Sequence, residues 1–174
     1  MKRIFTILSI AAAALLTLSC QKGDGDADYG NEFVYMPQAT VSGGIDNYYN
    51  VPTGQENTAN YYIEDGNVNV LLGVVRSGKS AYTAFSVDVL TDDALSSKAA
   101  EDLGATVLPA SAYTLPAKAD VKDGEAGASF VLAVQQSALQ GGKYVLGVKI
   151  ANPSKYELAK SNTSVVVVID SEAL

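Results

Sequence analysis

The chain contains no histidine, no tryptophan and a single cysteine, Cys20. Without histidine or a second cysteine it can form neither a Ser-His-Asp or Cys-His nucleophile nor a zinc site of imidazole or thiolate ligands. Only carboxylate chemistry remains, and glycoside hydrolysis would need two acids placed across a cleft. Asp88, Asp92, Asp93 and Glu101 lie where a polar strand face or a helix start would place acids anyway. We therefore expect no enzyme activity, no metal and no cofactor.

Basic residues are also scarce, because 12 Lys and Arg stand against 19 Asp and Glu, a formal net charge of −7. Two of the basic residues, Lys2 and Arg3, belong to the extreme N-terminus, so the rest of the chain is more acidic still. Nucleic acid and anionic lipid both require clustered Lys and Arg on the protein. The composition thus excludes both as partners, and solubility alone accounts for the acidity.

The N-terminus has the three parts of a secretory signal. Lys2 and Arg3 form the positive end, the apolar stretch runs from Ile4 to Leu18, and small Ser19 precedes Cys20. This apolar stretch is shorter than the roughly 20 residues that a transmembrane helix needs. Residues 1–19 are therefore predicted to be a lipoprotein signal peptide.

The segment Leu16–Cys20 resembles a bacterial lipobox, with Thr17 where an aliphatic residue is usual. We expect Cys20 to carry a diacylglyceryl group and an acylated amino terminus, because several acyl chains hold a protein stably on a membrane. Residues 20–31 are small and acidic and are predicted to form a flexible tether. Lys22 followed by aspartates resembles the surface-export signal of Bacteroidetes lipoproteins. The expected location is the outer membrane, on its external rather than its periplasmic face.

Residues 32–174 have the size of one domain and are dominated by short strand patterns. Apolar and polar residues alternate over 67–75 and 81–89, and further strands are predicted over 32–36, 130–134 and 144–150. The valine run 164–169 is typical of a central strand buried on both faces. One helix is predicted over 93–103, with Asp92 or Asp93 as its N-cap and Gly104 at its end. About seven strands and this one short crossover helix predict an all-β, immunoglobulin-like antiparallel β-sandwich, with a closed barrel as the alternative.

Several segments in order resemble a known family: Val34–Ala39, Val107–Leu115, Lys122–Ala126, Leu139–Tyr144 and the final valine strand. Over residues 32–170 they are similar to the Bacteroidetes lipoprotein domain called domain of unknown function seventeen-thirty-five. The resemblance implies an immunoglobulin-like sandwich from surface lipoproteins encoded beside glycan-uptake systems, without established catalytic residues. Members of that family often carry a further lectin-like or glycosidase module. Because this sequence stops at Leu174, we expect a small standalone lipoprotein.

The segment from Asp46 to Asp65 suggests a binding site because it combines tyrosines with Asn and Gln. Sugars bind to aromatic faces, and amides satisfy their hydroxyl groups. The candidate residues are Tyr48, Tyr49, Asn60, Tyr61 and Tyr62. The structural alternative is a long hairpin whose tyrosines pack onto the sheet. Neighbouring strand residues face opposite ways, so at most one ring of each tyrosine pair is expected to be exposed.

A second motif, Gly73–Ser80, fits the phosphate-loop pattern but has strand-like flanks, so we interpret it as a Ser-Gly-Lys hairpin. Two functional hypotheses remain. The first is a surface-anchored, non-catalytic accessory of glycan acquisition, which binds polysaccharide or docks on an outer-membrane uptake complex. The second is a structural or adhesive cell-surface protein with no small-molecule ligand.

Overall fold

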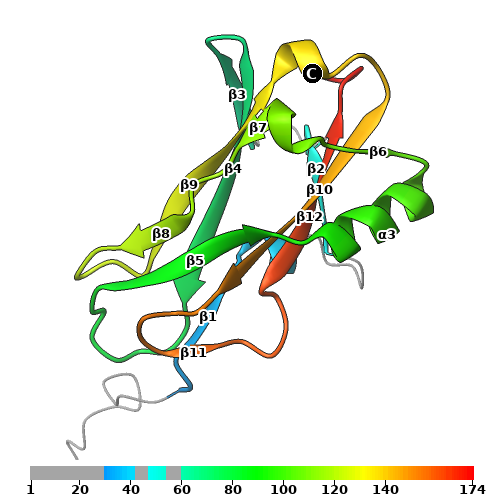
Figure 1. Ribbon diagram of the computed structural model, residues 1–174. Helices are drawn as coiled ribbons and strands as arrows, with labels where there is room; N and C mark the ends of the chain where they lie inside the picture. Colours follow the sequence, from blue (N-terminus) through cyan, green and yellow to red (C-terminus); the bar gives the residue numbers. More distant parts are fainter. Residues whose placement is uncertain (1–29, 42–46, 54–59) are drawn as a thin grey trace, which may run out of the picture.

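The computed structural model describes residues 30–41, 47–53 and 60–174 (Figure 1). The predictions for the signal peptide, Cys20 and most of the tether lie outside the described residues. In Figure 1 the first described residues lie at the lower end of the domain and the C-terminus at the upper end.

The domain is a sandwich of two six-stranded sheets, which confirms the predicted all-β, immunoglobulin-like class. Sheet A has the order β11 (Glu157–Leu158), β1 (Phe33–Tyr35), β4 (Asn67–Arg76), β9 (Gly127–Gln135) and β7 (Tyr113–Thr114), and β3 (Tyr61–Glu64) also pairs with β4. Sheet B has the order β2 (Tyr48–Val51), β12 (Ser164–Asp170), β10 (Lys143–Ala151), β5 (Phe85–Thr91) and β8 (Lys118–Val121), and β6 (Thr106–Val107) also pairs with β10. The helical segments are α2 (Gln38–Val41), α3 (Asp93–Leu103) and the 3-10 turns η2 (Ala110–Ala112) and η3 (Gln136–Ala138).

The core lies between the sheets and follows the alternation in the sequence. On β4 the side chains of Val68, Val70 and Leu72 are buried, while the residues between them face outward. β12 is different because its valines are buried on both faces. Val167 packs into the core between the sheets, whereas Val166 packs on the outer side of sheet B with Ala99 of α3. The prediction of a doubly buried central strand is therefore confirmed.

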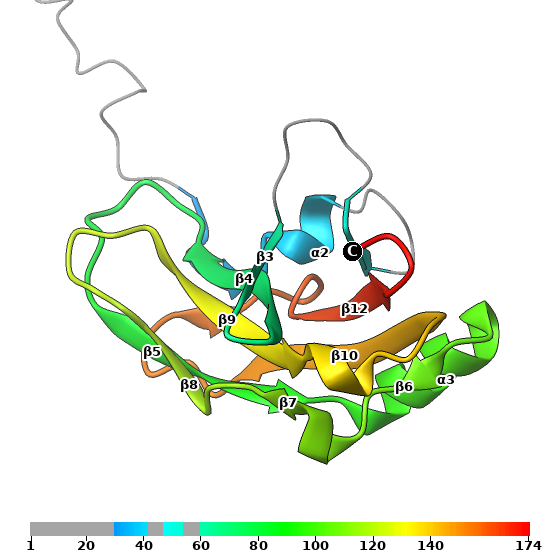
Figure 2. The ribbon, with the colours of Figure 1, turned by 90° about the horizontal axis from the view of Figure 1, so that it is seen from above.

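Helix α3 begins and ends as predicted, and Figure 2 shows it on the side of sheet B away from sheet A. The Asp92 side chain accepts a hydrogen bond from the N–H of Leu95, and Gly104 ends the helix in the left-handed region with φ 61°. The helix docks on Gly147 of β10, whose N–H donates to Ser96 Oγ at 2.8 Å and whose C=O accepts from the Asp92 N–H at 2.8 Å. The pairing of β10 with β5 ends at Val148. At the next position, Gly147, the start of helix α3 supplies the two hydrogen bonds that a neighbouring strand would otherwise make.

Two expectations were wrong in detail. The sheets contain more strands than the seven predicted, and three pairings, β1 with β11, β10 with β6 and β12 with β2, are parallel. The Ser-Gly-Lys segment is not a hairpin: β4 ends at Arg76, and the next strand, β5, belongs to the other sheet. Residues 77–84 contain no helix, so they lack the geometry of a phosphate loop.

Candidate functional site

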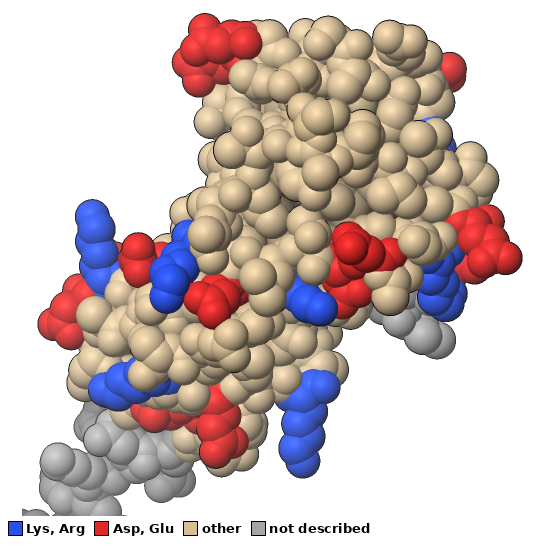
Figure 3. Space-filling view, viewed as in Figure 1, with Lys and Arg blue, Asp and Glu red and all other residues tan. Residues whose placement is uncertain are grey.

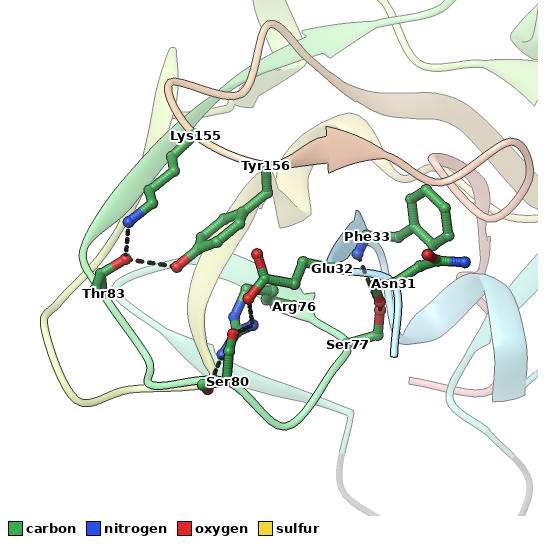
Figure 4. Close-up of polar contacts among 9 residues, drawn as sticks. All are labelled: Asn31, Glu32, Phe33, Arg76, Ser77, Ser80, Thr83, Lys155 and Tyr156. Atoms are coloured by element: carbon green, nitrogen blue, oxygen red, sulfur yellow. Dashed lines mark hydrogen bonds and ion pairs between the residues drawn. The ribbon is translucent and has the colours of Figure 1, made fainter. Parts of the chain in front are cut away.

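Two surfaces of the described domain could receive a ligand, and they lie on different parts of it. The first, the tether-end groove, is an open groove of about 460 Å³ beside the first described residues. It is lined by Gly30, Asn31, Glu32, Phe33, Ser80, Tyr156 and Glu157. Figure 4 shows the polar contacts that join the start of β1, the β4–β5 connection and residues 155–156, which precede β11.

Arg76, the last residue of β4, contacts three residues that line the tether-end groove, Glu32, Ser80 and Tyr156. Its side chain is 1% exposed and pairs with Glu32 Oε1 at 2.8 Å. It also donates to Ser80, to Oγ at 2.9 Å and to the carbonyl oxygen at 2.7 Å. The guanidinium carbon lies 4.6 Å from the ring centre of Tyr82 and 4.9 Å from that of Tyr156. A buried charge needs such partners. The hydrogen bonds of Arg76 therefore serve to hold the N-terminal segment, through Glu32, on the domain.

Tyr156 forms one wall of the groove in an unusual backbone conformation, with φ 72°. A side chain in the left-handed region is held at a cost of order 1–3 kcal/mol. Its hydroxyl lies 2.5 Å from Thr83 Oγ1, and its ring packs edge-on against Phe85 at 5.4 Å. The hydrogen bond with Thr83 lowers the pKa of Tyr156, and the charges of Lys155 and Arg76 lower it further. The polar groups of this wall therefore bond mainly to one another.

The second surface is the outward side of sheet A, which we call the sheet A face. Because side chains alternate along a strand and Val68, Val70 and Val134 point inward, their neighbours point outward. The register then places four residues in one row across four strands: Tyr62 opposite Asn69, Asn69 opposite Ala133, and Ala133 opposite Thr114. The adjacent row holds Glu64, Asn67 and Gln135. Tyr62 is 42% exposed, so the sheet A face presents an aromatic ring beside several neutral amides.

The predicted candidates Tyr48, Tyr49, Tyr61 and Tyr62 are divided between different environments. Tyr49 and Tyr61 pack against the core between the sheets. Tyr48 packs on the outer side of sheet B with the α3 cluster, its hydroxyl 3.4 Å from Asp102 Oδ2. Tyr62 lies on the sheet A face. Neighbouring rings point opposite ways, as strand geometry requires, but the four do not share one surface.

Asn60, the fifth candidate, is only 3% exposed and connects two strands of the sandwich. Its side-chain Nδ2 donates to the backbone carbonyl oxygen of Asn50 at 2.7 Å. The backbone carbonyl oxygen of Asn60 accepts from the backbone N–H of Leu71 at 2.9 Å. Burial raises the pKa of Tyr49, and a hydrogen bond with Asn60 partly opposes that rise. Asn60 and Tyr49 thus lie together, in a structural contact between β2 and β3.

The partners of Tyr62 on the sheet A face are residues that the sequence did not identify. Asn67 and Asn69 could have been found from the alternation of β4, because they are its polar positions. Thr114 and Gln135 could not, because they reach the face through pairing with β9 and β4, which are distant in the sequence. In the described part of the chain, no three His, Cys, Asp or Glu residues are grouped as metal ligands would be. No described helix is both long enough and apolar enough to cross a membrane.

The chain belongs to a family whose members share this domain at their N-terminus: the family model, described as an N-terminal domain, matches residues 29–157. No curated protein matches the chain. Among solved structures, a two-domain protein with unknown function from Bacteroides fragilis is similar at TM-score 0.52 and 16% identity, over 80% of this chain and 45% of that one. A multidomain protein including DUF1735 from Bacteroides ovatus is similar at TM-score 0.52 and 14% identity, over 80% and 45%.

These findings confirm the resemblance to the Bacteroidetes domain of unknown function. The apo-form Calx CBD1 domain is also similar, at TM-score 0.50 and 16% identity, over 80% of this chain and 96% of that one. At such identities the similarity establishes the sandwich fold alone. This chain spans less than half of the length of the two Bacteroides proteins.

Proposed function

We propose that this protein is a non-catalytic lipoprotein, anchored through Cys20 on the external face of the outer membrane, that binds polysaccharide in glycan acquisition. The observation that supports this proposal is the sheet A face, where the exposed ring of Tyr62 lies beside the amide of Asn69. An aromatic ring packs on the C–H side of a sugar, and amides donate to and accept from its hydroxyls.

The tether-end groove is the weaker candidate for the ligand site, although it is concave. Its lining residues Glu32 and Ser80 are already bonded to the buried Arg76, and the hydroxyl of Tyr156 is bonded to Thr83. A ligand there would have to replace bonds that hold the N-terminal strand in place. On the sheet A face, the amides of Asn67, Asn69 and Gln135 each donate one long hydrogen bond of 3.4 Å to a backbone carbonyl oxygen. A ligand there would replace only these weaker contacts.

The test is a glycan array followed by calorimetric titration of any glycan that binds to the purified protein. Tyr62→Ala should weaken binding at least about tenfold, which corresponds to about 1.4 kcal/mol, without lowering the melting temperature. Leu90→Ala is the matched control, because Leu90 is also 42% exposed but lies on β5 of sheet B. It should leave binding unchanged.

Tyr49→Ala separates binding from folding, because Tyr49 packs against the core. It should lower the free energy of unfolding by about 3 kcal/mol, as truncation of a packed aromatic ring does. If no glycan binds, or if Tyr62→Ala acts only on the melting temperature, the proposal fails. The structural or adhesive function would then be the better explanation.

A further inference from the structure

Resting on the proposed function, we infer that the ligand of the sheet A face is an uncharged polysaccharide that lies across strands β3, β4, β9 and β7. Polyanionic glycans, such as those built from uronic acids or sulfated sugars, are excluded. The inference depends on how charge is distributed between the two sheets.

The central strands of sheet A contain almost no ionised residues. β4 from Asn67 to Val75 and β9 from Gly127 to Gln135 have none, and neither has the segment 104–117, which contains β7. Figure 3 shows the consequence on one side of the molecule: charged side chains gather over the lower half, while the upper half, over β7 and η2, is uncharged except at its margins. In the two rows of the sheet A face around Tyr62, Glu64 is the one ionised side chain.

The outward side of sheet B has the opposite character. Asp88 pairs with Lys118 at 3.3 Å across β5 and β8, and Asp92 pairs with Lys149 at 3.1 Å beside α3. Helix α3 also packs against part of that side, over β10 and β12. The same chain therefore places ion pairs on the outward side of sheet B and mainly neutral amides, hydroxyls and apolar groups on the outward side of sheet A.

This asymmetry selects the charge of the ligand. A carboxylate or sulfate brought onto the sheet A face would lose part of its hydration without gaining a cation, and transfer of an unpaired charge out of water is unfavourable. It would also approach Glu64 and a protein of formal net charge −7, so both local and long-range electrostatics oppose it. A neutral sugar has only hydroxyls to satisfy, which the amides of Asn69 and Gln135 can do.

The row of residues also gives the direction of the ligand. Tyr62, Asn69, Ala133 and Thr114 occupy successive strands. At about 4.8 Å between strands, the row is about 14 Å long. An extended oligosaccharide with one ring on Tyr62 at the edge would thus reach Thr114 on the far strand.

The test compares neutral gluco-, manno- and xylo-oligosaccharides with galacturonic-acid oligosaccharides of the same length, titrated against the purified protein. We expect neutral oligosaccharides to bind and galacturonates to bind at least about tenfold more weakly. Thr114→Lys places a cation at the far end of the row and should shift the affinity ratio about fivefold or more toward galacturonate. High salt should abolish that shift, because exposed charges are screened.

The control is Ser97→Lys, which adds the same charge at an exposed position of α3, near the other sheet. It should leave the ratio unchanged. Galacturonate binding as tightly as neutral sugars in the unmodified protein would overturn the inference and leave the proposed function standing. If Thr114→Lys behaves like Ser97→Lys, the placement across the strands is wrong. If no oligosaccharide of either kind binds, the proposed function itself fails.

Discussion

Replacement of Arg76 by methionine tests whether the buried ion cluster stabilises the domain or is merely compatible with it. Methionine fills a similar length of apolar stem but removes the charge, the pair with Glu32, the bonds to Ser80 and the contacts with two tyrosine rings. Hydrogen bonds from a charged donor contribute about 1.5–3 kcal/mol each, and a cation over an aromatic ring about 0.5–2. The gain in apolar packing and the exposure of Glu32 offset part of this sum. We expect a net loss of about 3 kcal/mol.

The assay is urea unfolding of the purified protein at pH 7, with a thermal melt beside it. For a domain of this size, about 3 kcal/mol corresponds to a fall in Tm of roughly 6–12 °C. Glu32→Gln should cost less, about 1 kcal/mol, because that carboxylate is 35% exposed and can be hydrated. The loss of stability in the double variant, Arg76→Met with Glu32→Gln, should be smaller than the sum of the losses in the two single variants. If Arg76→Met changes stability by less than about 0.5 kcal/mol, desolvation of the cation cancels its bonds and the reasoning is refuted.

Four further outcomes are expected. Gly147→Ala should destabilise the domain by about 3 kcal/mol, because its Cβ would lie 2.6 Å from the Asp92 carbonyl oxygen; a urea midpoint equal to that of the unmodified protein would contradict this. The hydrogen bond from the Leu95 N–H and the partner Lys149 lower the pKa of Asp92. The stabilisation by the Asp92 carboxylate is therefore complete above the unfolded pKa of about 3.9 and is lost as the pH falls through the lower folded pKa. Asp92→Asn keeps the helix cap but has no carboxylate to protonate. Between pH 7 and pH 3 its free energy of unfolding should therefore fall less than that of the unmodified protein. Lys79→Ala should change stability by less than about 0.5 kcal/mol, and saturable nucleotide binding lost in that variant would restore the phosphate-loop interpretation. Cys20→Ala should abolish labelling by a fatty-acid probe, and protease added to intact cells should remove the unmodified protein; full protection would place it in the periplasm.

The predictions that succeeded depend on local signals. Asp92 and Gly104 bound a helix because a carboxylate can accept from free N–H groups and glycine tolerates positive φ, and both effects act within a few residues. The alternation along 67–75 gave the inward face of β4 for the same reason. The buried serine of α3 was missed, because Ser96 has a partner only once Gly147, far along the chain, lies beneath it.

The candidate binding site shows the same division. The sequence predicted one exposed ring in each tyrosine pair, with amides around the two exposed rings. Of the four tyrosines only Tyr62 is exposed beside amides, and these come from β4 and β9 rather than from the residues near Tyr48. Tyr48 and Tyr62 are close in the sequence and lie on different sheets, because the chain passes from one sheet to the other between β2 and β3. Proximity along a chain does not determine which face of a sandwich a residue occupies.

The sequence by itself determined the fold class, the caps of α3, the doubly buried β12 and the exclusion of imidazole and thiolate chemistry. Each of these follows from composition or from patterns of a few residues. Only the tertiary structure decided that Arg76 would be buried among Glu32, Ser80 and two tyrosines. It alone also decided that neutral residues would gather on the outward side of sheet A while ion pairs formed on the outward side of sheet B. Both arrangements depend on strand pairing between distant segments. The sheet to which a strand belongs is fixed by the free energy of the whole packed core and by no segment alone.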